Sequence, residues 1–476
     1  MLIDTEMKII SSTISRIIDH SLIFIVAILS YSIGMFVYEY ALSVPMLLLG
    51  LVAPVAFIFF LSRPKAFIYF AIGYWPFNIM INKFFKFLPG SNPYYQANLL
   101  GVVFVLGTVI GIVILLLGRT HIFKYKLTVP MLLFFGTVII GIFLSPLFFY
   151  AFRWIFRYGM PALLYFLILE KVDFDGAKRL LKLFSFSFIP VILFGYWMLI
   201  TQSEKLAIYE AFENTGEAVY RLGMMEGGSG FHPNSLGLHL AMFAVFYIFF
   251  FFESRIKYRW IYVLLIINSM VLLFHTYSRM GWVCFLAGIC VVGLLKSRKL
   301  LIAFLLGGAL ILATVPFLTR QITLRFEERG AVESRFKNFE VAWDLFLQKP
   351  ILGHGQGSYQ IITASRLKEG LRQRMQYGVG GTMAHNEYLR ILAESGVVGI
   401  GIFLFLMYRF LKLSVQIFKL PHPTAKNYGA FLIAAVVMSL LSGFPGEGYQ
   451  STNFYLWTFF AIGEIFLREL QSLQYA

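Results

Sequence analysis

One histidine and two arginines stand out as side chains that could carry out chemistry. His385 opens the segment His385-Asn386-Glu387. Histidine titrates near neutral pH, so it can take a proton from an attacking hydroxyl. Arg279 starts a long apolar run, and Arg335 stands near the start of a polar loop helix. Guanidinium groups form paired hydrogen bonds with phosphate oxygens, so these two arginines could bind a diphosphate.

Each of these residues also has a simpler interpretation. His385 could be a solvated loop residue, and an arginine at the end of an apolar helix often anchors it at the membrane interface. Arg221 is a third candidate for diphosphate binding, because it lies in an earlier polar loop shortly before Pro233-Asn234. The simpler interpretation weakens if the arginines and the histidine converge on one face.

A glycine-rich segment, Gly353-His354-Gly355-Gln356-Gly357, precedes the histidine. Alternating glycines permit tight turns and close backbone approach. The segment lacks the Lys-Ser/Thr ending of a phosphate-binding P-loop, so nucleotide binding is not indicated, and a plain turn between two helices remains the alternative. The residues that we expect to support the site are Gly353, Gly355, Gly357, Asn386, Glu387 and Trp343. His354 has no assigned role.

The elements that position these residues are membrane-spanning helices. The chain is 59% hydrophobic and only 13% charged, and its apolar runs reach the roughly 20 residues that a spanning helix needs. We therefore predict one integral-membrane domain over residues 1–476, an all-α transmembrane bundle of about 12–14 spans. The predicted spans are 21–38, 43–61, 66–82, 98–117, 129–149, 152–170, 183–200, 234–252, 260–275, 280–295, 300–317, 397–416, 427–443 and 452–467.

The distribution of positive charge predicts the orientation. The net charge is +16, and the alternate short loops between the spans are basic when both termini are placed in the cytoplasm. Two long polar segments, 201–233 and 318–396, then fall outside. The second contains eleven Lys or Arg against eight Asp or Glu. Long loops cross the membrane regardless of charge, so this excess calls for a functional reason.

Two amphipathic helices are expected within the 318–396 loop. The first runs from Ser334, a candidate N-cap, to about Gln348. Its aromatic residues Phe336, Phe339, Trp343 and Phe346 share one face. The second begins between 382 and 385 and runs to Glu394, with Gly396 placed to end it before the next span. Both helices could lie at the membrane surface.

No metal and no cofactor is predicted. The two predicted outer segments, 201–233 and 318–396, contain no Asp-X-Asp motif and no carboxylate cluster of the kind that binds a hard cation. Cys284 and Cys290 lie within one apolar run and form no metal-ligand pattern. A metal-dependent nucleotide-sugar transferase is therefore not indicated, and an outward-facing site favours a donor that is carried by a membrane lipid.

Taken in order, the motifs resemble the O-antigen ligase and O-antigen polymerase superfamily. They are Pro233-Asn234, Thr276-X-Ser278-Arg279-X-Gly281, Glu333-Ser334-Arg335 through Trp343, Pro350-X-X-Gly353-X-Gly355-X-Gly357, His385-Asn386-Glu387-Tyr388-Leu389 and Glu394-X-Gly396. The resemblance covers Arg221 to Gly396. The first half of the chain resembles the family only in its spans.

The resemblance implies an inverting, metal-independent glycosyltransferase of the bacterial inner membrane. Such an enzyme moves a glycan from undecaprenyl diphosphate to an acceptor hydroxyl on the periplasmic face. The diphosphate-binding arginines of the family would fall on Arg279 and Arg335, and its essential histidine on His385. The expected partners are the lipid-linked donor, membrane lipid, and an acceptor that is either lipid A core or a second lipid-linked glycan. Nucleic acid is not expected.

Two alternatives remain open at this stage. A ligase and an O-antigen or exopolysaccharide polymerase of the same superfamily share the donor and the loop, and we favour the ligase on motif resemblance alone. A transporter of lipid-linked oligosaccharide would belong to another class. Transporters commonly show internal repeats and polar residues at mid-membrane, whereas here the unusual polar residues gather at one face.

Overall fold

The computed structural model describes residues 58–84, 99–117, 121–201, 207–211, 218–226, 229–231, 233–314, 319–320, 323, 330–365, 384–446 and 448–475. The first predicted span, 21–38, lies outside these residues, and so does most of the second, 43–61.

The described chain is almost entirely helical, which confirms the all-α prediction. The helices are α3 (Pro64–Phe84), α4 (Leu99–Leu117), α5 (Thr128–Leu144), α6 (Phe148–Lys171), α7 (Phe174–Ser187), α8 (Ile189–Thr201), α9 (Pro233–Glu253), α10 (Arg259–His275), α11 (Arg279–Lys296), α12 (Arg298–Thr314), α14 (Gly330–Gln348), α15 (Ser358–Ser365), α17 (Glu387–Phe418), α18 (Pro423–Ser442) and α19 (Gly448–Tyr475), with short 3-10 turns η2 (Ile122–Lys124) and η3 (Ile256–Tyr258).

Long apolar helices make this a multi-pass membrane protein. Among the described residues, seven helices are long and apolar enough to cross a membrane, and three shorter apolar helices accompany them. The seven are Tyr150–Lys171, Phe174–Thr201, Pro233–Glu253, Ile256–His275, Arg279–Lys296, Glu387–Phe418 and Pro423–Ser442. The larger predicted total of 12–14 is not tested by this count, because parts of several predicted spans lie outside the described residues.

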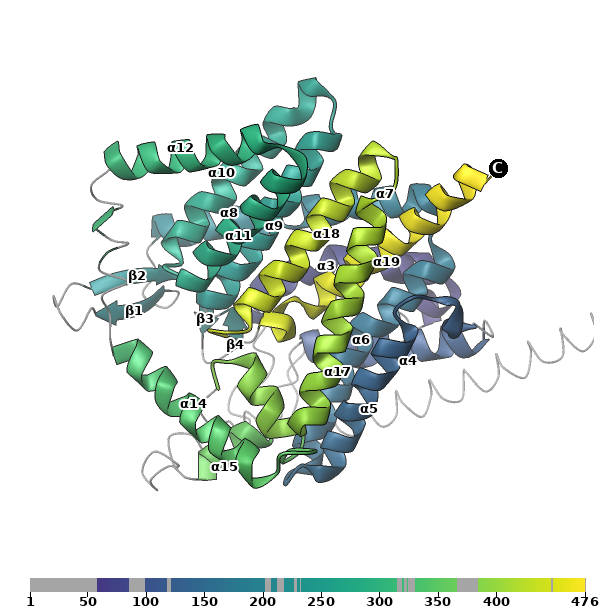
Figure 1. Cartoon of the computed structure of the whole chain (residues 1–476), viewed down its shortest axis with the longest axis vertical. Coiled ribbons are helices and arrows are strands. Elements are labelled where there is room, and N and C mark those ends of the chain that lie inside the picture. The colour runs from purple at the N-terminus through teal and green to yellow at the C-terminus, as the bar shows by residue number, and fades with distance from the viewer. Residues whose placement is uncertain are drawn as a thin grey trace, which may run out of the picture.

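The core of the bundle is built around α9, α18 and α19 (Figure 1). Helix α9 is buried along nearly its whole length, because α10, α11 and α18 all pack against it. Aromatic rings fill the space between these helices. Phe243 stacks on Phe188 with ring centroids 3.9 Å apart, and Phe246 contacts both Phe431 and Phe459. Close aromatic packing of this kind fixes the helices relative to one another.

Several predicted boundaries are shifted. The break between α5 and α6 falls at 145–147, whereas the predicted break fell at 150–151. Pro161 lies inside α6, as it does inside the predicted span 152–170. Residues 207–231 form two small antiparallel hairpins, β1 (Ala207–Ala211) with β2 (Ala218–Leu222), and β3 (Met224–Glu226) with β4 (Ser229–Phe231). These hairpins were not predicted.

The 318–396 loop also differs in detail from the prediction. Helix α14 ends at Gln348 as predicted, but it begins at Gly330, so the assignment of Ser334 as N-cap was wrong. The glycine-rich segment leads into α15, a short helix that was not predicted. Helix α17 joins the second loop helix and the following span, and Gly396 interrupts it with φ 62° and ψ −162°. We call residues 385–395, which lead up to this break, the α17 arm.

A buried carboxylate cluster ties the loop before α5 to α19. Glu464 accepts hydrogen bonds from the Tyr165 hydroxyl at 2.5 Å and from the Lys126 backbone N–H at 3.1 Å. Beside it, Glu170 accepts from the Tyr125 hydroxyl and pairs with Lys124. We call the end of the bundle that contains Glu464 and Glu170 the far end.

Candidate active site at the loop face

Arg279 is the first residue of α11, and the turn before it is tightly specified. Ser278 caps the helix, because its hydroxyl accepts a hydrogen bond from the Gly281 N–H at 3.1 Å. The Thr276 hydroxyl accepts from the Ser278 N–H at 3.2 Å. Tyr277 has a left-handed φ of 49°, and burial raises the pKa of its phenol. The sequence Thr-Tyr-Ser-Arg therefore encodes a rigid turn that presents Arg279, which is partly buried.

Arg221 reaches this same turn from strand β2. Its Nε donates to the Thr276 carbonyl at 3.1 Å, and its Nη2 donates to the Asn234 side-chain oxygen at 2.9 Å. Only 2% of Arg221 is exposed. Its guanidinium thus joins the hairpin, the start of α9 and the turn before Arg279. This geometry favours a bracing role over the direct diphosphate contact that the sequence suggested.

The start of α9 packs directly against the turn before Arg279. A Cβ added to Gly237 would lie 2.7 Å from the Ser278 Cβ and 3.0 Å from the Thr276 hydroxyl oxygen. A side chain at this position would therefore push the turn away. The Pro233-Asn234 motif, one turn earlier, starts the helix that makes this contact.

His385 lies at the start of the α17 arm in a left-handed conformation, with φ 51°. Asn386 caps the arm, because its side-chain oxygen accepts a hydrogen bond from the Leu389 N–H at 3.0 Å. The Glu387 N–H donates to the Gly443 carbonyl at the end of α18 at 2.8 Å, and the Tyr388 hydroxyl donates to the Leu440 carbonyl at 2.6 Å. These bonds fix the backbone on which His385 stands, and the side chain itself is partly exposed.

The turn that carries Arg279 and the arm that carries His385 meet at the end of α18. A Cβ on Gly446 would lie 3.1 Å from the sulfur of Met280, the neighbour of Arg279. Gly443, three residues earlier, accepts the hydrogen bond from Glu387. The structure thus brings Arg221, Arg279 and His385 to one end of the bundle, which we call the loop face.

The glycine-rich segment docks onto the break in α17 through backbone hydrogen bonds. The N–H groups of His354 and Gly355 donate to the carbonyls of Ala393 and Glu394, both at 2.9 Å. In return, Val397 and Val398 donate to the carbonyls of Pro350 and Ile351, at 2.8 and 3.3 Å. A helix break leaves backbone groups unsatisfied, and this segment supplies their partners.

Glycine is required along this segment for two reasons: the backbone has positive φ angles, and a Cβ atom would clash with neighbouring backbone. Gly353, Gly355 and Gly357 have φ of 68°, 98° and 73°. A Cβ on Gly353 would lie 2.3 Å from the Glu394 carbonyl carbon, and one on Gly355 would lie 2.3 Å from the Ser145 nitrogen at the end of α5. The expected tight turns and close backbone approach are therefore present. His354 adds a contact to α14, since its Nε2 lies 3.0 Å from the Leu345 carbonyl.

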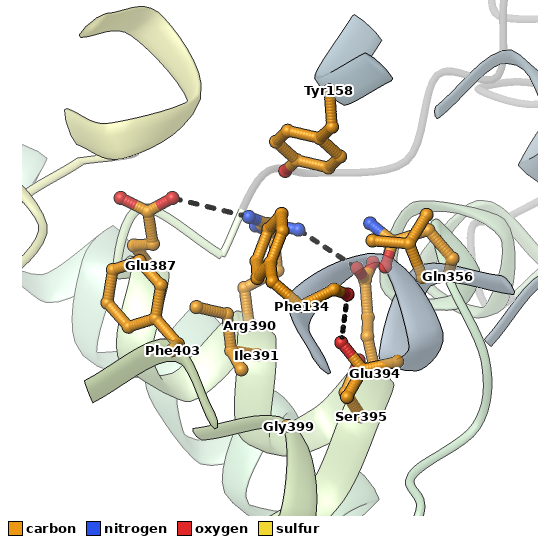
Figure 2. Close-up of a pocket in the computed structure, with 12 residues that line it drawn as sticks. Phe134, Tyr158, Gln356, Glu387, Arg390, Ile391, Glu394, Ser395, Gly399 and Phe403 are labelled. Carbon is orange, nitrogen blue, oxygen red and sulfur yellow. Dashed lines mark hydrogen bonds and ion pairs between the residues drawn. The ribbon is translucent and has the colours of Figure 1, made fainter. Parts of the chain in front are cut away.

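A buried ion triad occupies the α17 arm (Figure 2). Arg390 Nη1 lies 3.0 Å from Glu394 and Arg390 Nη2 lies 3.4 Å from Glu387. These three side chains are only 5%, 2% and 1% exposed. The guanidinium also lies 5.7 Å from the centroid of the Trp154 ring, and the Tyr158 hydroxyl points toward it in Figure 2.

The sequence analysis missed Arg390 and Glu394 as partners. The available signal was the spacing Glu-X-X-Arg-X-X-X-Glu, which places all three side chains on one helix face. A small cavity of about 20 Å³ lies beside the triad, lined in part by Tyr158 and Gln356. This is room for about one water molecule, and too little for a sugar.

Arg335 and Trp343 lie on α14, which packs against the α17 arm. The inner face of α14 carries the fully buried Ala342 and Leu345. Trp343 and Phe336 point away from this face and are 47% and 59% exposed. Arg335 is partly exposed near the start of the helix.

The described residues contain no group of three or more His, Cys, Asp or Glu side chains that could hold a metal ion.

The chain was compared with models of known protein families. Residues 261–404 match the family described as O-Antigen ligase. The matched segment begins in α10 and ends in α17, so it contains Arg279, Arg335, the glycine-rich segment and His385. None of the curated proteins matches the chain.

Proposed function

We propose that this chain, whose residues 261–404 match the O-antigen ligase family, transfers a glycan from undecaprenyl diphosphate to an acceptor hydroxyl. The observation that carries the proposal is the convergence at the loop face. Arg279 on its capped turn and His385 on the α17 arm are held by the same end of α18. A cation for a phosphate and a base for a hydroxyl are the two groups that this reaction needs.

In the proposed reaction, the acceptor oxygen attacks the anomeric carbon of the donor sugar from the side opposite the diphosphate. The new glycosidic bond forms as the bond to the diphosphate oxygen breaks, so the anomeric configuration inverts. His385 takes the acceptor proton on a ring nitrogen. The bond electrons leave with undecaprenyl diphosphate, and Arg279 and Arg335 stabilise the negative charge that develops there.

Arg221 has a different part in this proposal from the other two arginines. It braces the turn that presents Arg279, through Thr276 and Asn234, and does not itself bind the donor. Exposed aromatic residues of α14 suit a helix at the membrane surface, where the lipid tail of the donor would approach. We place the loop face on the periplasmic side of the bacterial inner membrane, with both termini in the cytoplasm, because the loops at the opposite end are basic.

The test is glycan transfer by purified protein from lipid-linked donor. We expect Arg279→Ala, Arg335→Ala and His385→Ala each to lower transfer by at least about a hundredfold while the protein still accumulates in the membrane. The matched controls are Arg298→Ala and His121→Ala, two exposed residues of the far end, which should leave transfer unchanged. Normal transfer by the three site variants would refute the site.

The same assay separates this function from transport, since a transporter makes no product. The acceptor is identified separately, by analysing surface glycan in a deletion strain. We propose the ligase reaction, with lipid A core as acceptor, so long chains should remain on undecaprenyl diphosphate. Single repeat units on lipid A core would instead identify a polymerase, whose acceptor is a second lipid-linked glycan.

A further inference from the structure

We propose that Arg390 is the positioning residue of this active site. Held between Glu387 and Glu394, it keeps the α17 arm rigid and so fixes His385 relative to the helices that carry the two arginines. The inference rests on the proposed function, because it assigns a catalytic consequence to a residue that does not touch the substrate.

The triad is deeply buried. Three ionised side chains of the α17 arm are at most 5% exposed and meet within 3.0 and 3.4 Å. Removing charges from water is expensive, and a buried ion pair commonly adds no more stability than apolar residues of the same volume. The triad instead fixes the orientation of its side chains, because a planar guanidinium holds two carboxylates in fixed directions.

Each glutamate of the triad is also connected to a different neighbouring element. Glu394 Oε1 accepts a hydrogen bond from the Tyr359 N–H at 3.4 Å, and the Glu394 carbonyl accepts from Gly355 at 2.9 Å. The Tyr359 hydroxyl donates to the Asn338 carbonyl at 3.0 Å, one turn along α14 from Arg335. The triad is therefore connected to the helix of Arg335.

The other carboxylate connects the triad to the remaining groups of the site. Glu387 is two residues from His385, and its N–H donates to the Gly443 carbonyl at 2.8 Å. The segment 443–446 then contacts Met280, beside Arg279. Arg390 thus lies at the point where the supports of all three proposed catalytic residues meet, although its own side chain faces the buried side of the arm.

Loss of this rigidity should lower the rate of the chemical step more than it weakens substrate binding. A displacement of about 1 Å between reacting groups can reduce a rate about a hundredfold. Donor affinity depends on the arginines and on the lipid tail, so it should change little. Lysine keeps the charge of Arg390 but cannot hold two carboxylates in a fixed plane.

The experiment compares three proteins with the wild type, purified at full length. They are Arg390→Lys, the charge-free triple variant Glu387→Gln/Arg390→Met/Glu394→Gln, and Tyr165→Phe. The last breaks a buried hydrogen bond to a carboxylate at the far end and serves as the matched control. Each is assayed for kcat, for KM of the lipid-linked donor, and for thermal unfolding.

We expect Arg390→Lys and the triple variant to unfold within a few degrees of the wild type, with kcat at least about tenfold lower and donor KM within about twofold. Tyr165→Phe should unfold at a lower temperature with unchanged kcat. Wild-type kcat in both of the variants that replace Arg390 would overturn the inference. It would also be overturned if neither variant accumulates, since Arg390 would then serve stability, or if kcat falls equally in Tyr165→Phe.

His385→Ala, assayed in parallel, separates this inference from the proposed function. If His385→Ala transfers glycan at the wild-type rate, the proposed catalytic site is wrong whatever the Arg390 variants do. If His385→Ala is inactive while the Arg390 variants are normal, only the positioning role is wrong.

Discussion

The two ends of the bundle contain buried carboxylates in two different settings. At the far end, Glu464 of α19 accepts hydrogen bonds from the Tyr165 hydroxyl of α6 and from the Lys126 N–H in the loop before α5. At the loop face, Glu387 and Glu394 share one arginine, and their contacts spread to α14, α18 and the glycine-rich segment. Helix α5 connects the two ends, with Lys126 before its start and Ser145 after its end.

This difference indicates which charged clusters serve function. A carboxylate whose contacts stay within the far end contributes to stability, and its removal should destabilise the whole fold. A cluster whose contacts lead to a histidine and two arginines can change the rate of a reaction with little effect on stability. The predictions below test this distinction, from the largest expected effect to the smallest.

The largest effect should follow from a substitution at Gly396 that disrupts the break in α17. Gly396→Val would place a β-branched residue at φ 62°, with its Cβ 2.2 Å from the Ile351 carbonyl oxygen. Strain and overlap together should cost on the order of 4 kcal/mol and detach the glycine-rich segment. Membrane accumulation and thermal unfolding measure the loss. Gly401→Ala, in the same helix with open space around it, is the control and should be neutral or slightly stabilising.

The next effect should be confined to the far end. Glu464→Ala leaves the Tyr165 hydroxyl and the Lys126 N–H buried without their acceptor, which should cost about 3 kcal/mol. Transfer per folded molecule should stay at the wild-type value. Glu469→Ala removes an exposed carboxylate from the same helix and should change neither quantity. A fall in kcat for Glu464→Ala would show that the two ends are not functionally separate.

A smaller effect is expected where the loop face connects to α14. Tyr359→Phe removes the hydrogen bond to the Asn338 carbonyl, which should cost about 1 kcal/mol and lower kcat a few-fold. Tyr408→Phe, on the exposed side of α17, provides the comparison. If the Tyr359→Phe variant is less stable but has an unchanged kcat, the connection from Glu394 to the helix of Arg335 does not contribute to catalysis.

The smallest expected effect is a difference in how the thermal stability depends on pH when the helix cap at each end is replaced. Asp173 caps α7, and the hydrogen bond from the Gly176 N–H lowers the pKa of its carboxyl. A lowered folded-state pKa means that the stabilisation is complete above the ordinary pKa and is lost as the pH falls through the folded value. Thermal unfolding of Asp173→Asn should therefore vary less than that of the wild type below about pH 4.

At the loop face, the corresponding cap is the amide of Asn386, which does not titrate. Asn386→Ala should lower stability by about 1 kcal/mol at every pH, with no change in the pH dependence. An altered acid response in Asn386→Ala would contradict this assignment of the two caps.

The sequence predicted the class of fold and most of the helices, because long apolar runs have few alternatives in a membrane. It also predicted the turn at Gly396 and the tight conformations of Gly353, Gly355 and Gly357, since glycine marks such positions locally. It could not predict that these glycines meet across forty residues of chain, because backbone hydrogen bonds between distant segments leave no periodic signal.

The candidate site could likewise be predicted only in part from the sequence. Arg279, Arg335 and His385 were chosen by residue type and motif, and the structure places Arg279 and His385 at one end of the bundle. Arg221 was grouped with the other arginines, yet its burial and its bond to Thr276 depend on a hairpin that the sequence did not reveal. Arg390 was overlooked because an arginine flanked by glutamates usually indicates a solvated helix face.

The docking of the glycine-rich segment has a consequence for how this protein can change. Four main-chain hydrogen bonds join residues 350–355 to the break in α17, and none of them depends on a side chain. The attachment therefore tolerates replacement of the surrounding residues, provided that the glycines remain. A chain built this way can acquire a new acceptor preference through substitutions near the loop face while the frame that aligns its catalytic groups stays intact.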